Sequence, residues 1–486
     1  MTPRYAILDY ETSLLKDGEC PRTKFIGLYD GVTYRTFKRT FDLTRYLRGA
    51  DRMTLLHHGN FDVLQMLVDG AQVKITKSHG AKIIRSEAYG HTMLNTHAIF
   101  PVALSRIFAA FGHKKTSLAR LGKRNYEDCV WGLGDCLALA SEVEEICGVN
   151  PLTRGTMAST GMRACELVAG KMPQENRFES AFRGGRVEMF WGGEWLARKF
   201  DINSSYPFSI LDVPPTITLR HVWVKVSDFW CPFFTETIKD KLVFPNGTFT
   251  TWIFDDVFER YIEPYVDKAC VRTISKHKIR TEWLQGIKPL IQSVYNLKQT
   301  SKGARREAAK LFVNAVYGRF GLRGEHETPI FARNVAASDD LVYFPLGRGR
   351  YLSFKTMFRP TRHNFAFAAY ITDNARARLY KAFAKNGGLY GDTDSVFTVQ
   401  PFAENEGTAC GDWKNEGKHN LKLTGLKDYR WKNRFVIKGG KHHFQWTLKQ
   451  FAAGETVKEI TRTRGLPVTK RRCHADGSTT PLIMSA

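Results

Sequence analysis

Two aspartates one residue apart constrain this chain more than any other feature of its sequence. Asp392 and Asp394 lie in the stretch GGLYGDTDSVFTV, at a polar tip between β-prone residues. Like charges this close repel each other, so the pair is either a solvated hairpin tip or a site where bound cations compensate the carboxylates. A third acid, Asp201, precedes a turn in KFDINSSYPFSI, where a lone aspartate most often caps the turn.

A helical segment with a basic face favours the cation site. In KLFVNAVYGRFG, Lys310, Asn314 and Tyr317 fall on one face of a helix that Gly318 is expected to end. Four cations recur every four residues on the way into this segment: Lys298, Lys302, Arg306 and Lys310. Such a ladder is either an ordinary solvated face or, with Asn314 and Tyr317 beside it, a clamp for a triphosphate.

Phosphoryl transfer explains both features together. Two divalent cations roughly 3.5–4 Å apart activate an attacking hydroxyl and stabilise the leaving oxygens. Hard cations such as Mg²⁺ and Mn²⁺ take oxygen ligands, and their charge makes crowded carboxylates tolerable. The sequence therefore predicts that Asp201, Asp392 and Asp394 gather around two such ions, beside a helix that grips a nucleoside triphosphate.

The composition fits a nucleic-acid-binding protein and argues against several other classes. Lys and Arg number 72 against 48 Asp and Glu, a net charge of +24 that favours a polyanionic partner. The nine cysteines include no C-x-x-C pair, which argues against a disulfide framework or a zinc module. No apolar run reaches the roughly 18 residues of a membrane span, and MTPRYAILDYETS meets an acid too early for a secretory signal. We therefore expect no membrane segment and a reducing compartment.

The three segments resemble the polymerase motifs of family B DNA polymerases, in the same order. DINSSYP is similar to D-x-x-S-L-Y-P, KLFVNAVYG to K-x-x-x-N-S-x-Y-G, and YGDTDS to Y-x-D-T-D-S, with departures only at Ser205 and Ala315. The resemblance implies a metal site with these members: Asp201, Asp394, the main-chain carbonyl of Ile202 and, close by, the catalytic Asp392.

The same resemblance assigns a second group of residues to the incoming nucleotide. Tyr206 would lie under its sugar as the steric gate against a ribose 2′-hydroxyl. The triphosphate would be bound by Lys298, Arg306 and Lys310. The pocket of the nascent base pair would be shaped by Asn314 and Tyr317.

Two further stretches resemble DNA-contacting motifs of the family. FRGG, at residues 182–185, is similar to the Y-x-G-G linker whose backbone approaches DNA; the matching residues are Phe182, Gly184 and Gly185. IKGGKHHFQW is similar to the primer-positioning K-x-Y motif; the matching residues are Lys441 and His443, with Lys438 as a competing alignment.

The N-terminal third resembles a proofreading 3′–5′ exonuclease. ILDYETS matches a D-x-E motif through Asp9 and Glu11, and the i, i+2 spacing on a strand points both acids to one face. HHGNFDVLQML supplies Phe61 and Asp62 for the second motif. VWGLGDCLALA is similar to the third motif, Y-x-x-x-D, through Trp131 and Asp135. The resemblance implies that four carboxylates bind metal and act in catalysis: Asp9, Glu11, Asp62 and Asp135.

This part of the chain also departs from the exonuclease pattern. Trp131 lacks the tyrosine hydroxyl that would orient the attacking water. Two supporting positions stay open between neighbours: His58 or Asn60 for the asparagine of the second motif, and Lys114 or Lys115 for the catalytic lysine.

The length of 486 residues predicts two to four domains. The resemblance implies an α/β and α+β multidomain fold, with a ribonuclease H-like exonuclease domain followed by a right-hand polymerase of palm, fingers and thumb. The predicted boundaries are 1–155 exonuclease, 156–198 linker, 199–265 palm, 266–295 an insertion of the kind that contacts a terminal protein, 296–321 fingers, 322–360 an insertion of the kind that encircles DNA, 361–402 palm, 403–470 thumb and 471–486 a loosely held tail.

The two insertions favour the protein-primed branch of the family. The chain would then be the monomeric replicative polymerase of a virus, phage or linear mobile element, acting in the cytoplasm of the host cell. Its partners would be primer–template DNA, dNTPs and a terminal protein whose Ser, Thr or Tyr hydroxyl accepts the first nucleotide. Two alternatives stay open: a compact family B polymerase that uses a nucleic-acid primer or none, and a non-catalytic DNA-binding subunit that keeps the fold.

Overall fold

The structure, a computed structural model, describes residues 4–13, 22–79, 82–115, 120–227, 233–238, 241–266, 270–322, 325–333, 343–346, 350–358, 362–432, 434–437, 471–474, 476 and 478–484. These residues form two compact units of mixed α/β structure. The first unit takes its described residues from 4–167 and 293–358, and the second takes them from 168–292, 362–437 and 471–484. The predicted fingers and second insertion thus belong to the same unit as the predicted exonuclease domain.

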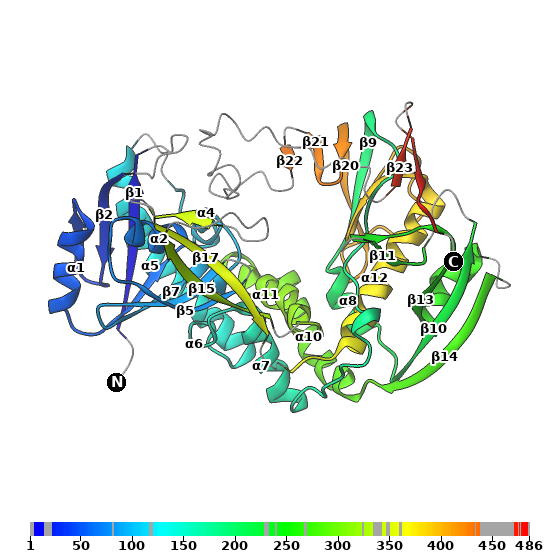
Figure 1. Cartoon of the computed structure of the whole chain (residues 1–486), viewed down its shortest axis with the longest axis horizontal. Coiled ribbons are helices and arrows are strands. Elements are labelled where there is room, and N and C mark those ends of the chain that lie inside the picture. Colours follow the sequence, from blue (N-terminus) through cyan, green and yellow to red (C-terminus); the bar gives the residue numbers. More distant parts are fainter. Residues whose placement is uncertain are drawn as a thin grey trace. The chain divides into compact units, whose positions relative to one another are not determined.

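A ten-stranded mixed sheet forms the centre of the first unit (Figure 1). Its strands, in spatial order, are β16 (Tyr343–Pro345), β17 (Arg350–Phe358), β15 (Glu325–Arg333), β5 (Lys74–His79), β6 (Lys82–Ala88), β7 (His91–Asn95), β4 (Thr54–His57), β1 (Tyr5–Thr12), β2 (Thr23–Tyr29) and β3 (Tyr34–Phe37). Among the described strands of this sheet, the parallel neighbours are β1 with β4 and β4 with β7. The segment predicted as the second insertion therefore extends the sheet, because β15 pairs with β5.

Alternation along β1 explains how the sheet is buried on both faces. Ala6 and Leu8 join one hydrophobic core with Leu43, whereas Ile7 joins another with Leu133. The helices of this unit are α1 (Thr40–Gly49), α2 (Phe61–Val68), α3 (Thr96–Ile99), α4 (Leu104–Ala110), α5 (Leu121–Cys147), α6 (Pro151–Arg154) and α11 (Gly303–Val316); α7 (Met157–Ala169) and α10 (Glu282–Thr300) cross the unit boundary. Both sheet faces are thereby covered.

The long helix α5 ends at a glycine. Gly148 follows it in the left-handed conformation at φ 70°, and its N–H donates to the Glu144 carbonyl at 2.7 Å. The basic segment that carries Lys298, Arg306 and Lys310 is not one continuous helix, because α10 ends at Thr300 and α11 begins at Gly303. The predicted ladder of cations is therefore interrupted, and Lys298 lies on a different helix from Arg306.

Helix α11 is anchored on α4 and α5 within the first unit. Its Ala308 and Leu311 share a hydrophobic core with residues of α5. Arg305 lies 3.1 Å from the Glu142 carboxylate of α5, and Glu307 lies 2.7 Å from Arg106 of α4. A short 3₁₀ turn, η6 (Tyr317–Arg319), continues α11 past the predicted end.

An antiparallel seven-stranded sheet forms the centre of the second unit. Its strands, in spatial order, are β22 (Arg434–Ile437), β21 (Asp428–Trp431), β20 (Trp413–Gly425), β9 (Gly193–Ile202), β19 (Ser395–Thr398), β18 (Gly388–Asp392) and β8 (Val187–Met189). Helix α12 (Phe365–Asn386), buried along most of its length, packs on β18 and β19, and α8 (Ser205–Leu211) packs on α12. The short segments η2 (Glu179–Ala181), α9 (Asp255–Val257), η3 (Phe258–Ile262) and η4 (Glu263–Tyr265) complete the described helices.

The second unit also has a four-stranded sheet that takes in the last described strand. Its order is β14 (Val271–Arg280), β10 (Thr216–Val226), β13 (Asn246–Phe254) and β25 (Ile483–Met484); β11 (Glu236–Ile238) pairs with β12 (Lys241–Val243), and β23 (Arg471–Cys473) with β24 (Thr479–Pro481). Arg471 is 2% exposed and lies 3.3 Å from the fully buried Glu188. The described part of 471–486, which was predicted as a loosely held tail, is instead anchored by paired strands and by the buried Arg471 and Thr479, while Arg472 and His474 are exposed.

No helix in the described ranges is long and apolar enough to cross a membrane.

Candidate active sites

Strand register brings three predicted carboxylates to one end of the seven-stranded sheet. Ser395 of β19 lies opposite Asp201 on one side and opposite Asp392 on the other. The N–H of Ile202 donates to the main-chain oxygen of Asp394 at 2.7 Å. Residues almost two hundred positions apart in the chain thus meet around a single hairpin.

The turns that carry these acids have an unusual backbone. Thr393, between the two aspartates, has φ 61°, and Ser204, three residues after Asp201, has φ 55°. A non-glycine residue in the left-handed region costs free energy and is enriched at functional sites. The N–H of Thr393 donates to the Arg186 carbonyl at 2.6 Å, which helps to hold the turn in this conformation.

Crowding of negative charge raises the pKa of the central carboxyl group. Burial, together with repulsion from Asp201 and Asp392, raises the pKa of Asp394 to about 7. Burial also raises the pKa of Asp201, in spite of the Lys199 ammonium 3.5 Å away. Three oxygen-donor groups whose charges oppose one another suit divalent cations, which would relieve the repulsion.

Two lysines beside this site were not predicted from the sequence. Lys199 precedes Asp201 by two residues on β9, a spacing that points both side chains to one face. Lys427 lies 3.1 Å from Asp392, and its backbone, at φ 51°, is also left-handed. The i, i+2 spacing could have revealed Lys199, but nothing in the sequence connects Lys427 with Asp392.

The FRGG segment touches the predicted steric gate. A side-chain carbon added to Gly185 would lie 2.9 Å from the Thr393 side chain and 3.1 Å from the Tyr206 hydroxyl, so any larger residue would require these side chains to shift. Arg376 of α12 fixes this segment by donating to the carbonyls of Arg183 and Gly184, at 2.8 and 2.9 Å. Phe182 stacks on Phe365 at the start of α12.

The predicted nucleotide-binding residues are divided between the two units: Tyr206 lies in the second unit, and the others lie in the first. Arg306, Lys310 and Asn314 share one face of α11, away from the buried Ala308 and Leu311. Tyr317 begins η6, and Lys298 lies near the end of α10. Because Asp201 and Asp394 belong to the second unit, their approach to these residues stays a prediction. Lys441 and His443, and the competing Lys438, lie outside the described residues.

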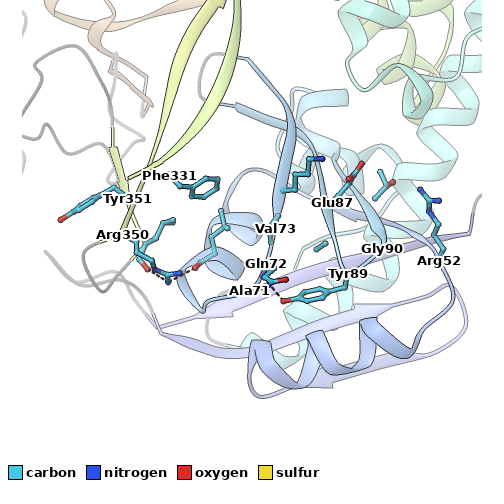
Figure 2. Close-up of a pocket in the computed structure, with 15 residues that line it drawn as sticks. Arg52, Ala71, Gln72, Val73, Glu87, Tyr89, Gly90, Phe331, Arg350 and Tyr351 are labelled. Carbon is cyan, nitrogen blue, oxygen red and sulfur yellow. Dashed lines mark hydrogen bonds between the residues drawn. The ribbon is translucent and has the colours of Figure 1, made fainter. Parts of the chain in front are cut away.

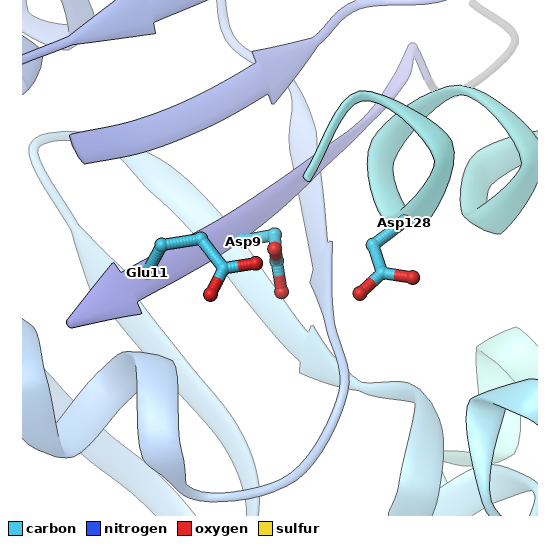
Figure 3. Close-up of side chains that lie close together, drawn as sticks. All are labelled: Asp9, Glu11 and Asp128. Atoms are coloured by element: carbon cyan, nitrogen blue, oxygen red, sulfur yellow. The ribbon is translucent and has the colours of Figure 1, made fainter. Parts of the chain in front are cut away.

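A second carboxylate cluster lies in the first unit (Figure 3). Asp9 and Glu11 project from β1, and Asp128 faces them from α5. One oxygen from each of the three carboxylates lies within 4.8 Å of the other two. Asp62, at the start of α2, accepts the N–H of Tyr10 at 2.9 Å and so lies beside the same strand.

The negative charges of this cluster also repel one another. Burial, followed by repulsion from Asp62, Asp128 and Glu11, raises the pKa of Asp9 well above its usual range. Burial raises the pKa of Asp62 to about 7. Such a donor set fits a divalent cation, whose charge would allow all the carboxyl groups to ionise.

Asp128 takes the position that the sequence assigned to Asp135. The Asp135 carboxylate accepts from His113 at 2.9 Å, and Trp131 stacks on that same imidazole, 4.6 Å between ring centroids. Seven residues of α-helix separate Asp128 from Asp135, which is about 10 Å along the axis. Neither Asp135 nor Trp131 is therefore part of the carboxylate cluster.

Two cations balance the cluster instead of a tyrosine. Lys115 lies 2.5 Å from Asp128, which favours it over Lys114 as the lysine of the site. Four residues before Asp128, where the Y-x-x-x-D pattern has tyrosine, stands Arg124; its guanidinium is 3.6 Å from Asp128 and 4.0 Å from Glu11. Lys115 was one of the two candidates that the sequence offered, whereas Arg124 was hidden by the alignment to Asp135.

A hydrogen-bond chain that the sequence did not reveal orients Asp9. The Asn125 amide donates to the Asp9 carboxylate at 2.6 Å and to its main-chain oxygen at 3.1 Å. The Tyr34 hydroxyl donates to the Asn125 side-chain oxygen at 2.7 Å. Gly27 lies directly across from Asp9 on β2, and an added side-chain carbon there would collide with the Asn125 amide, 1.9 Å away.

The candidates for the second exonuclease motif have structural partners. Asn60 accepts the N–H of Ile83 at 2.9 Å and so ties the start of α2 to β6. His58 bonds the Thr96 hydroxyl through Nδ1 at 2.9 Å. Phe61 packs partly against the core beside α2. Asp62 is the member of this motif that hydrogen-bonds the main chain of β1, the strand of Asp9 and Glu11.

A cavity of about 910 Å³ lies elsewhere in the first unit, between the β5–β7 strands and the β17 segment (Figure 2). Its lining includes the charged residues Arg52, Lys74, Glu87 and Arg350. Arg350 donates to the Leu67 carbonyl at 3.4 Å, so its guanidinium supports the wall. A single carboxylate gives this cavity no set of metal ligands.

Comparison with known proteins identifies the fold. No protein-family model and no curated protein matches the chain. Solved structures of Phi29 DNA polymerase do match. The orthorhombic crystal form is 15% identical over 90% of each chain, with a TM-score of 0.64. The ternary complex with primer–template DNA and incoming nucleotide substrates is 16% identical over 91% of each chain, with a TM-score of 0.63. The complex with single-stranded DNA is 14% identical over 99% of each chain, with a TM-score of 0.62. The chain therefore shares the fold of this polymerase.

Proposed function

We propose that the chain is a DNA-directed DNA polymerase of family B, of the protein-primed kind, with a 3′–5′ exonuclease. The observation that carries the proposal is the convergence of Asp201, Asp392 and Asp394 around one hairpin, on the fold of a DNA polymerase. The second carboxylate cluster, at Asp9 and Glu11, supports a separate excision site.

In the proposed polymerase site the chain's own groups bind and orient the reactants. Two divalent cations would supply activation of the primer hydroxyl and charge for the leaving pyrophosphate. Asp201 and Asp394, with the Ile202 carbonyl, would hold these ions, and Asp392 keeps the local charge negative. Tyr206 excludes a ribose 2′-hydroxyl, and Gly185 limits its movement, because a side-chain carbon added there would lie 3.1 Å from the tyrosine hydroxyl.

On the helical side, Arg306 and Lys310 bind the triphosphate, with Lys298 from α10 contributing. Asn314 and Tyr317 shape the pocket of the nascent base pair. The backbone at Phe182, Gly184 and Gly185 approaches DNA; the space beside Gly184 is open, since an added side-chain carbon would meet no atom within 4 Å.

In the proposed excision site Asp9, Glu11 and Asp128 would hold a divalent cation, and Asp62 completes the negative surface. Lys115 places a positive charge where a scissile phosphate would gather negative charge. Asn125 holds the Asp9 carboxylate in one orientation. The site would remove mismatched 3′ ends.

Primer extension tests the polymerase proposal. The parent chain should extend a paired primer with dNTPs and Mg²⁺ or Mn²⁺, and Asp394→Asn should reduce extension by several orders of magnitude while sparing excision. Full extension by the Asp394→Asn variant would refute the assignment of these carboxylates to the polymerase active site. An inactive parent chain would favour the alternative of a DNA-binding subunit.

A transfer assay tests protein priming. The segment 266–295 would contact a terminal protein, whose hydroxyl would accept the first nucleotide. A labelled dNTP should become covalently attached to such a partner in the presence of origin DNA. Extension of DNA or RNA primers without any such adduct would favour the compact polymerase that needs no terminal protein.

A further inference from the structure

Arg124 of α5 lies beside two buried carboxylates of the proposed excision site. Its Nε is 3.6 Å from Asp128, one helical turn further along α5, and 4.0 Å from Glu11 of β1. A basic and an acidic residue four positions apart on a helix often form an ordinary surface pair. Arg124 differs from such a residue, because it also approaches an acid of the sheet and both acids are buried.

The two carboxylate oxygens of Asp128 have different surroundings. Oδ2 accepts from the Lys115 ammonium at 2.5 Å and is the oxygen nearest to Arg124. Oδ1 is buried and has no hydrogen-bond partner among the described residues, and the whole residue is only 3% exposed. A buried oxygen without a partner carries a desolvation cost that a bound cation would remove. Asp128 therefore offers one oxygen to a metal ion, while its other oxygen is already bound to a lysine.

The spacing of the donor oxygens suits a single ion. One oxygen from each of Asp9, Glu11 and Asp128 lies within 4.8 Å of the other two (Figure 3). Ligand oxygens on opposite sides of one Mg²⁺ ion are about 4 Å apart, so a small adjustment would let all three bind the same ion. The second oxygens of Asp9 and Asp128 accept from Asn125, at 2.6 Å, and from Lys115. A second ion would have to displace these donors.

The charge of the site also balances with one divalent ion. The four carboxylates of the site, once ionised, face two cations, Lys115 and Arg124. Two negative charges remain, and one divalent ion neutralises them. Burial raises the pKa of Glu11, and Arg124 opposes this rise; burial likewise raises the pKa of Asp128, against Lys115 and Arg124. A second ion would therefore enter a site that is already neutral and that holds a guanidinium.

The chemistry of excision gives a guanidinium a role at this position. Hydrolysis joins a water oxygen to the phosphorus and breaks the bond from phosphorus to the 3′ oxygen of the shortened strand. The water gives one proton to solvent, and the leaving oxygen takes one from solvent. Negative charge gathers on the phosphoryl oxygens, which a guanidinium can bind through two parallel N–H groups. The Arg124 side chain is 25% exposed, so a DNA end can reach it.

We infer that the Arg124 guanidinium substitutes for a second metal ion in the excision site: it binds the scissile phosphate, and one divalent ion completes the site. The inference rests on the proposed excision function and concerns the same site. It sets this chain apart from the pair of ions that its D-x-E motif predicts, because the residue in the place of the motif's tyrosine is a permanent cation.

A count of bound Mn²⁺ ions tests the inference without relying on excision. The starting protein is the full chain with Asp201→Asn and Asp394→Asn, which remove the ligands of the proposed polymerase ions. Electron paramagnetic resonance measures free Mn²⁺ during a titration, and thymidine 5′-monophosphate is present to supply a phosphate. The ions that are lost when Asp9→Asn is added are those of the excision site.

The expected count is one ion in the starting protein and two after Arg124→Met, which removes the charge and keeps a long side chain. Two Mn²⁺ ions roughly 3.5–4 Å apart should also show spin coupling. Arg124→Lys keeps the charge and should keep the count at one. Lys123→Met is the matched control, because Lys123 is an exposed neighbour that pairs with Glu127 at 3.8 Å, and it should also leave one ion. Thermal melting should show that all variants are folded.

Excision supplies a second measurement, in chains that keep Asp201 and Asp394. At low Mg²⁺, Arg124→Met should reduce single-turnover excision by roughly 10²–10³-fold, the usual effect of removing one group that stabilises developing negative charge. The remaining rate should rise with the square of the Mg²⁺ concentration, whereas the rate of the unmodified chain should rise with its first power.

Two results would overturn the inference. Any count other than one in the starting protein would show that Arg124 does not substitute for an ion. An unchanged count in Arg124→Met would make its contact with Asp128 an ordinary helix pair, whatever the rate of excision. Failure of the proposed function is separate: a chain whose count rises from one to two in Arg124→Met, but which removes no mismatched 3′ end, would refute excision and keep the single-ion site.

Discussion

The two aspartates of helix α5 offer a matched pair for testing the excision site. Asp128 and Asp135 are both poorly exposed, each has a basic side chain close to its carboxylate (Lys115 at 2.5 Å and His113 at 2.9 Å), and they lie two turns apart on one helix. Asparagine at either position keeps the size of the side chain and removes its charge. Of the two, however, only Asp128 has a carboxylate oxygen within 4.8 Å of oxygens of Asp9 and Glu11.

The expected effects differ by orders of magnitude. Loss of a group that merely supports a metal ligand costs about 10- to 100-fold in metal affinity or activity. Asp128→Asn removes one of three charged ligands, so excision should fall by at least roughly 100-fold. Asp135→Asn weakens one hydrogen bond to His113, worth about 1 kcal/mol of folding stability, and should leave the excision rate close to that of the parent.

Single-turnover degradation of a 5′-labelled primer with a mismatched 3′ end measures this difference. The reaction contains Mg²⁺ and no dNTPs, and extension of a paired primer by the same preparations is the control for folding. Loss of excision in Asp135→Asn with retention in Asp128→Asn would refute the assignment of the site. Retention in both variants would mean that the carboxylate cluster does not degrade DNA.

Three further predictions concern the groups that support the two sites. Gly185→Ala should push the Tyr206 hydroxyl aside at a packing cost of about 1–3 kcal/mol, and a competition between dNTP and rNTP should show altered sugar discrimination with excision unchanged; an unaltered ratio would contradict the proposed gate. Asn125→Ala should raise the Mg²⁺ concentration for half-maximal excision about 10- to 100-fold, with the rate recovering at saturating Mg²⁺; a loss that Mg²⁺ cannot restore would argue against an orienting role. Glu188→Gln should leave the buried Arg186 and Arg471 without a counter-charge and lower the free energy of unfolding by about 3–5 kcal/mol. Urea unfolding would measure this loss, and an unchanged midpoint would contradict a stabilising network.

The spacing of residues in strands was enough to predict where the main acids meet. Asp9 and Glu11 alternate with buried residues on β1, and Asp392 and Asp394 flank the turn of a hairpin. The antiparallel pairing of β9 with β19, which brings Asp201 to that hairpin, is a long-range contact that local pattern does not specify. The order of the three motifs made it predictable.

Helical periodicity explains the misplaced third exonuclease acid. Residues seven apart on a helix lie on nearly the same face, so Asp128 and Asp135 are equivalent by pattern and differ only in their position along the axis. That position depends on where α5 lies against β1. The hydrogen bond from Asn125 of α5 to Asp9 of β1 is one of the contacts that define it. No sequence rule fixes such a contact.

The segment from Arg471 onward shows why composition alone misjudges a basic stretch. Arg471 reaches Glu188, and Glu188 also binds Arg186, whose guanidinium is fully buried and lies 2.5 Å away. The Arg186 carbonyl in turn accepts the N–H of Thr393, the residue between the two aspartates of the hairpin. Charge in this segment therefore stabilises the turn that carries the proposed polymerase carboxylates, and an effect of its substitution on nucleotide incorporation would not by itself indicate contact with DNA.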